Sequence, residues 1–121
     1  MGVSVLWPTH AILVAAYELL RSTPPFMKWG LPEADAIRFE VIANRRVFGE
    51  YNYDCAKGLH IIRISQLRHT QLQTILMTMA HEMIHLREQQ QGRRWDVQHG
   101  RAFCRMAAQV CKIHGFDLGA F

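Results

Sequence analysis

The chain contains few cysteines and no long apolar run. Its three cysteines, at positions 55, 104 and 111, are spread widely over 121 residues, and none belongs to a Cys-x-x-Cys pair. An odd number at this spacing argues against a disulfide framework and against a cysteine-rich zinc module. The richest apolar stretch, residues 11–20, is about half as long as a membrane-spanning helix requires, so we expect no membrane partner.

The N-terminal residues lack the charged leader and cleavage site of a secretory signal, which predicts an intracellular, cytoplasmic protein. Half of the residues are apolar and a fifth are charged, as is typical of a single folded domain over residues 1–121. The formal net charge of +4 permits contact with nucleic acid, and hence association with the nucleoid, but does not demand it.

Hydrophobic periodicity predicts three helices, over residues 11–21, 71–91 and 99–114. Gly92 and Gly115 follow the second and third of these segments, and glycine commonly ends helices. The second helix is apolar over most of its circumference, which indicates that it is buried.

Three strands are expected between the first two helices, over residues 37–42, 47–53 and 59–64. The connections between them are too short for parallel crossovers, so we expect an antiparallel meander. Together these elements predict an α+β fold, in which an N-terminal helix, a buried central helix and a C-terminal helix pack on a small three-stranded antiparallel sheet.

The central helix carries the pattern His-Glu-x-x-His, formed by His81, Glu82 and His85. Residues four apart lie on one face of a helix, so both imidazoles can bind one zinc ion. Glu82 then lies beside the open coordination positions, where its carboxylate can take a proton from the attacking water. The alternative is an accidental match on a solvated helix. It is disfavoured because burying these polar groups in an apolar helix is costly unless a metal pairs with them.

A catalytic zinc ion usually takes three protein ligands, and His99 is the third ligand that we predict. The other downstream candidates are Glu88, Asp96, His114 and Asp117. On a helical wheel of residues 99–114, His99 begins the apolar stripe that must face the core, and therefore points towards the metal helix. The alternative role for His99 is an ordinary residue at the start of a helix, in contact with water.

With these histidines in place, the chain resembles the SprT-like zinc metalloproteases, a family that includes the Spartan proteases acting on DNA–protein crosslinks. The resemblance covers roughly residues 49–113. It is carried by Gly58, the run Ile-Arg-Ile-Ser at 62–65, the His-Glu-Met-Ile-His run at 81–85, Asp96, and His-Gly-x-x-Phe-Cys at 99–104. It implies a minimal zincin-like fold without a zinc ribbon.

The resemblance further implies a zinc-dependent endopeptidase, with Zn²⁺ on His81, His85 and His99 and with Glu82 as general base. Protein substrates are then expected, among them DNA-associated or DNA-crosslinked proteins. We expect the strand at 59–64 to lie at a sheet edge and to pair with an extended substrate. Two alternatives stay open: a non-catalytic, zinc-stabilised module that binds DNA or protein, and another zinc hydrolase such as an amidase.

Several residues near the motif are weaker candidates. Asp96 is a candidate to orient a ligand imidazole, or equally to cap the last helix. Thr78 lies one turn before the motif, where it can hydrogen-bond a ligand or, more commonly, the backbone. Tyr51 and Tyr53 are candidates to stabilise the oxyanion, although core packing is the commoner role for tyrosines on a strand.

A basic patch with one aromatic residue is expected beside the metal. It comprises Arg93, Arg94, Trp95, Arg101 and Arg105. Contact with phosphates and stacking on bases would suit single-stranded or protein-crosslinked DNA. A solvated charged face is an equally good interpretation, because basic patches are common.

Overall fold

The computed structural model describes residues 8–68, 71–92 and 98–121. Helix α1 (His10–Arg21) is followed by two 3₁₀ turns, η1 (Phe26–Lys28) and η2 (Ala34–Ala36). Strands β1 (Ile37–Ile42), β2 (Gly49–Asp54) and β3 (Leu59–Ser65) then precede helices α2 (Leu72–Gln90) and α3 (Arg101–His114). The chain is therefore α+β, as predicted, and the three helices and three strands lie within about two residues of their expected bounds.

The sheet is mixed, so the prediction of an antiparallel meander was wrong. Its strand order is β1-β3-β2. β2 and β3 form an antiparallel hairpin, whereas β1 pairs in parallel with β3, in a register that sets Ile37 opposite His60. The short connections do rule out a parallel pair of consecutive strands. However, β1 and β3 are not consecutive, and β2 itself carries the chain back between them.

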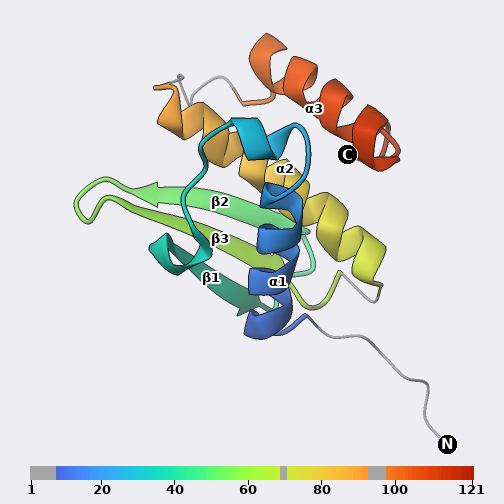
Figure 1. The fold of residues 1–121 in the computed structure, drawn as a ribbon. Coiled ribbons are helices and arrows are strands. Elements are labelled where there is room, and N and C mark those ends of the chain that lie inside the picture. The colour runs from blue at the N-terminus through green and yellow to red at the C-terminus, as the bar shows by residue number, and fades with distance from the viewer. Residues whose placement is uncertain (1–7, 69–70, 93–97) are drawn as a thin grey trace, which may run out of the picture.

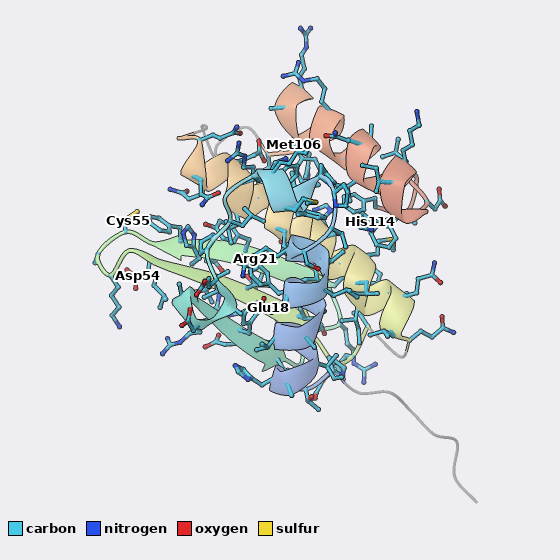
Figure 2. All side chains as sticks on the ribbon, viewed as in Figure 1. Glu18, Arg21, Asp54, Cys55, Met106 and His114 are labelled. Atoms are coloured by element: carbon cyan, nitrogen blue, oxygen red, sulfur yellow. The ribbon has the colours of Figure 1, made fainter. Side chains whose placement is uncertain are left out.

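The strand order also changes which strand is exposed at an edge. β3 is the central strand, so the expectation that residues 59–64 form an edge was wrong. The edge strand nearest to α2 is β2. Helix α2 runs across β2 and contacts it (Figure 1). Figure 2 shows Asp54 and Cys55 at the tip of the β2–β3 hairpin.

Helices α1 and α2 cover one face of the sheet. Tyr17 of α1 packs edge-on against Phe39 of β1, with ring centroids 5.3 Å apart. Thr78 of α2 packs on Gly49 of β2. The side chains that fill this layer are fully buried apolar residues, chiefly Leu13, Phe26, Ile62, Ile64, Ile75, Met79, Met83, Ile84 and Leu86. This core fixes α2 against the sheet.

The opposite face of the sheet is polar. There Arg63 of β3 donates to Glu40 of β1 at 2.6 Å and to Asn52 of β2 at 2.7 Å. One guanidinium group therefore joins all three strands. Among the residues that the structure describes, no helix is both long and apolar enough to cross a membrane.

Helix ends follow the local sequence. Thr9 caps α1, because its hydroxyl accepts a hydrogen bond from the amide of Ile12 at 3.2 Å. Gly115 ends α3 in the left-handed conformation, with φ of 76°, as its position predicts. α3 begins only at Arg101, two residues later than expected, and this places His99 outside the helix.

Candidate metal centre

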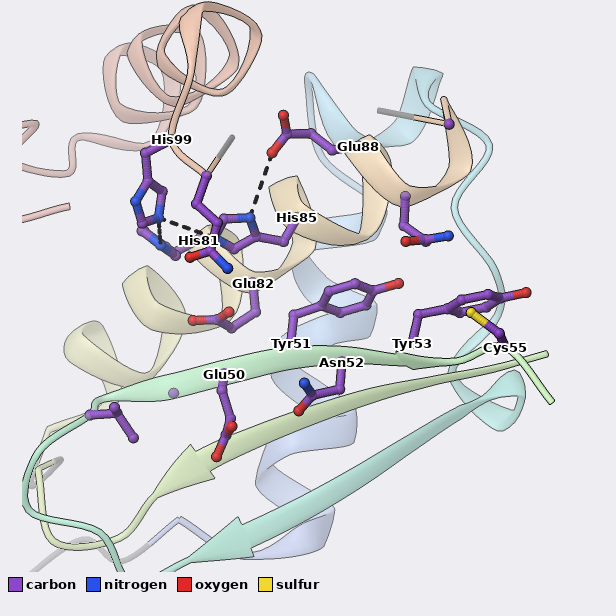
Figure 3. A pocket seen from close by; sticks show the side chains of 15 residues that line it. Glu50, Tyr51, Asn52, Tyr53, Cys55, His81, Glu82, His85, Glu88 and His99 are labelled. Carbon is purple, nitrogen blue, oxygen red and sulfur yellow. Dashed lines mark hydrogen bonds and ion pairs between the residues drawn. The ribbon is translucent and has the colours of Figure 1, made fainter. Parts of the chain in front are cut away.

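Three imidazoles meet between α2 and the start of α3 (Figure 3). The Nε2 atom of His99 lies 3.1 Å from Nε2 of His81 and 3.2 Å from Nε2 of His85. Ligand atoms of the three residues all lie within 4.8 Å of one another. Two nitrogens bound tetrahedrally to one zinc ion at the usual bond length would be roughly 3.3 Å apart. The cluster therefore has the donor type and spacing that zinc requires.

His81 and His85 face the same way because they are one turn apart on α2, as the motif predicts. His99 arrives by a different route from the one we expected. It lies before α3 with φ of 56°, a left-handed backbone that is uncommon outside glycine. His99 therefore points towards α2, as predicted, but the helical-wheel argument for that direction was wrong because His99 is not part of α3. The turn at His99, and not a helix face, directs the ring towards α2.

The second nitrogen of each α2 imidazole has an oxygen partner. Nδ1 of His81 lies 2.8 Å from the main-chain oxygen of Phe121, and Nδ1 of His85 lies 3.5 Å from Oε1 of Glu88. An acceptor at Nδ1 holds the proton there and leaves Nε2 free as a ligand. Both rings thus present the nitrogen that faces His99.

Burial keeps these imidazoles neutral. It lowers the pKa of His81 to about 4, with a further contribution from the neighbouring His99. Burial likewise lowers the pKa of His85 to about 3, assisted by His81 and His99. A metal binds the neutral form of histidine, so these two rings need lose no proton at neutral pH before they can bind one.

Glu82 is buried on the side of α2 that faces β2, with only 5% of its surface exposed. Burial raises the pKa of its carboxyl group to about 8, and the carboxylate of Glu50 on β2 contributes in the same direction. A metal cation bound by the three imidazoles would oppose this shift, because an opposite charge favours the carboxylate form. The proton affinity of Glu82 therefore depends on whether a cation occupies the site.

Phe103 forms an apolar wall behind all three imidazoles. Its ring centroid lies 4.9 Å from that of His81, 4.8 Å from that of His85 and 4.6 Å from that of His99. The side chain is 5% exposed and lies in the first turn of α3. Such a wall limits the rotation of the rings and excludes water from their rear side.

A groove of about 750 Å³ opens beside the imidazoles, between β2 and α2. Its walls come from β2, the hairpin tip, α2 and the turn before α3; Gly49, Glu50, Tyr51, Asn52, Tyr53, Cys55, His81, Glu82, His85, Glu88 and His99 are among them. The hydroxyl of Tyr51 lies 2.6 Å from Nδ1 of His60, and the ring of Tyr53 lies against the same imidazole. Both tyrosines therefore line the groove, and both also contact the imidazole of His60.

The remaining candidates are placed as follows. Asp96, Arg93, Arg94 and Trp95 lie outside the described residues. Thr78 is buried with its methyl group against Gly49, a packing role that places it beside β2.

Arg101 and Arg105 are exposed on α3. His114 lies near the other end of α3 (Figure 2), where its Nε2 is 2.7 Å from the oxygen of Pro24. Asp117 accepts a hydrogen bond from the amide of Gly119. His114 and Asp117 thus have partners other than the Nε2 cluster, and the carboxylate of Glu88 lies on the Nδ1 side of His85.

Phe103 and Phe121 also contact the cluster, and a sequence motif includes only the first of them. Phe103 belongs to the His-Gly-x-x-Phe run, which marks its position in the sequence but does not predict its contact with all three rings. Phe121 lies 40 positions from His81 in the sequence, and no local pattern predicts a contact over that distance.

Most of the sequence matches a known protein family. The model of the SprT-like family matches residues 16–118, which include the second half of α1, the sheet, the three imidazoles and Glu82. No curated protein is similar enough to the chain to count as a match.

Proposed function

The chain belongs to the SprT-like family, a family of zinc-metalloprotease-like domains, and we propose that it is a zinc-dependent endopeptidase that hydrolyses protein substrates. The convergence of three Nε2 atoms beside a buried carboxylate carries this proposal. His81, His85 and His99 hold the metal. A bound zinc ion would supply a Lewis acid that polarises the scissile carbonyl and lowers the pKa of a bound water towards about 7.

Glu82 acts as the general base and then as the general acid. Its side chain lies on the same helix as two of the ligands and faces the groove. It removes a proton from the attacking water and passes that proton to the leaving amine. A purely structural zinc site would be expected to use a fourth protein ligand and has no need for a buried carboxylate at this place. The position of Glu82 therefore favours an enzyme over a binding module.

The outer edge of β2 binds the substrate main chain. The amide of Ser65 donates to the oxygen of Phe48, so the antiparallel alternation turns the main-chain groups of Gly49, Tyr51 and Tyr53 away from β3. These groups are the free edge of the sheet along the groove. An extended peptide can add to that edge through main-chain hydrogen bonds, which select little for sequence.

DNA-associated or DNA-crosslinked proteins are the substrates that we propose. Arg101, Arg105 and Lys112 lie on the exposed side of α3, the helix that directly follows the ligand His99. Phosphates bound there would hold a protein attached to DNA near the groove. Single-stranded DNA is the form that we propose, because exposed basic side chains can follow its phosphate backbone.

Cleavage of a basic protein substrate tests this proposal. The zinc-loaded protein is expected to cleave it, and Glu82→Gln is expected to lower the rate by about 100-fold or more while zinc binding is retained. Equal cleavage by both variants would exclude Glu82 as the base. If zinc-loaded protein cleaves no substrate with or without single-stranded DNA, the enzyme proposal is wrong. A rate that DNA leaves unchanged would remove only the DNA-linked part.

A further inference from the structure

The segment that follows α3 turns back towards the metal cluster. Gly115, in the left-handed conformation, ends the helix, and the amide of Phe116 returns to the oxygen of Cys111 at 3.1 Å. The ring of Phe116 then stacks near that of Phe121, with centroids 6.2 Å apart and planes 16° apart. Residues 116–121 therefore fold back beside α3 and do not continue in the direction of the helix.

A second turn directs Phe121 towards α2. The side chain of Asp117 accepts from the amide of Gly119 at 3.0 Å, and its main-chain oxygen accepts from the amide of Ala120 at 3.0 Å. The amide of Phe121 bonds to the oxygen of Leu118 at 3.3 Å. These three bonds fix the direction in which the main chain of Phe121 points.

Phe121 meets His81 in two ways. Its main-chain oxygen lies 2.8 Å from Nδ1 of His81, and its ring centroid lies 5.2 Å from the imidazole centroid at an angle of 50°. His81 is thus held between Phe103 on one side and Phe121 on another. Nε2 of the same ring is left facing His99.

We propose that Phe121 is a positioning residue for the metal centre, because its main-chain oxygen fixes the tautomer of His81. The oxygen accepts the Nδ1 proton, so Nε2 keeps its lone pair and points at the other two ligands. An imidazole without this acceptor would carry its proton on Nε2 for part of the time, and that tautomer cannot bind a metal through Nε2. The inference rests on the proposed zinc site and adds to it a contact from the segment that follows α3.

The tautomer is measured directly from the ring ¹⁵N chemical shifts of His81 in the intact, metal-free protein. We expect the proton on Nδ1. A proton on Nε2 would overturn the proposal without the need for any variant. Because no metal is present, this measurement is independent of whether the protein binds zinc or cleaves a substrate.

Three variants then separate the oxygen from the ring. A chain shortened to end at Leu118 loses both, Phe121→Ala loses only the ring, and Leu118→Ala changes an exposed neighbour in the same segment. We expect the shortened chain to move the His81 proton towards Nε2 and to bind zinc about 10- to 100-fold more weakly in a competition with a chelator. Phe121→Ala and Leu118→Ala should keep the Nδ1 proton.

A shortened chain that keeps the Nδ1 proton, or one that loses it and still binds zinc as tightly as the intact chain, would overturn the proposal. Failure of the intact chain to bind zinc would instead refute the proposed function. The circular dichroism spectrum of each variant shows that it is folded before either comparison is made.

Discussion

The main chain of Gly49 lies so close to the methyl group of Thr78 that a Cβ at position 49 would stand 2.8 Å from it and 2.9 Å from the oxygen of Arg63. β2 and α2 can approach this closely only because position 49 has no side chain. Thr78 lies one helical turn before Glu82, so the same contact sets the distance between Glu82 and the edge of the sheet. The β2–β3 register runs without interruption from Gly49 to Asp54, so the close approach does not distort the strand.

We therefore expect Gly49→Ala to destabilise the protein by about 1 to 3 kcal/mol, as overpacking of a tight contact does. Urea unfolding measures the change in free energy. Gly119→Ala is the matched control, because its nearest heavy atom would lie at an ordinary 3.5 Å. Similar stability of the two variants would show that α2 can shift away from β2 at little cost.

His99→Ala tests the third ligand without reference to activity. Removal of one of three imidazoles should weaken zinc binding by several orders of magnitude, because two ligands on one helix hold the ion poorly. His114→Ala is the control, since that ring bonds to Thr23 and Pro24 at the other end of α3. Competition with a chelator measures both affinities, and equal affinities would remove His99 from the site.

The raised pKa of Glu82 predicts a pH dependence of stability in the metal-free protein. The folded state holds this proton up to about pH 8, whereas the unfolded state releases it near pH 4.5. The resulting stabilisation is complete below pH 4.5 and is lost as the pH rises through about 8. Glu82→Gln cannot titrate, so its stability relative to the original protein should increase from pH 5 to 8.

That increase can reach about 1.4 kcal/mol per pH unit. Urea unfolding at several pH values in the presence of a chelator measures it, and the titrations of His81 and His85 are shared by both proteins and largely cancel. Glu50→Gln should flatten the dependence, because the carboxylate of Glu50 contributes to the shift. A difference that is constant with pH would contradict the burial of an ionisable Glu82.

Phe103→Leu should weaken zinc binding more than it weakens the fold. Leucine fills much of the same volume but lacks the aromatic ring that stacks on His85 and meets His81 and His99 edge-on. We expect a zinc affinity about 10-fold lower, with the free energy of unfolding of the metal-free protein reduced by about 1 kcal/mol. The absorption spectrum of the cobalt-substituted protein reports any change in ligand geometry. An unchanged spectrum and affinity would limit Phe103 to core packing.

Local patterns predicted the elements of this fold, and distant contacts decided how they are joined. Thr9 and Gly115 mark helix ends through their own chemistry, so the sequence around them was sufficient. β1 could pair with either β2 or β3, and the alternation of apolar and polar side chains does not indicate which of the two it joins. The left-handed backbone at His99 is likewise unexpected for a residue that is not glycine.

The order of the strands has a consequence for how the chain folds. Partners in the β2–β3 hairpin begin only five positions apart, at Asp54 and Leu59, whereas Ile37 must find His60. Closing the shorter loop costs less entropy, so we expect the hairpin to form first and β1 to be added later, with α1 packed on it. The β2 edge that we propose binds a peptide would then form before the N-terminal third of the protein packs on the sheet.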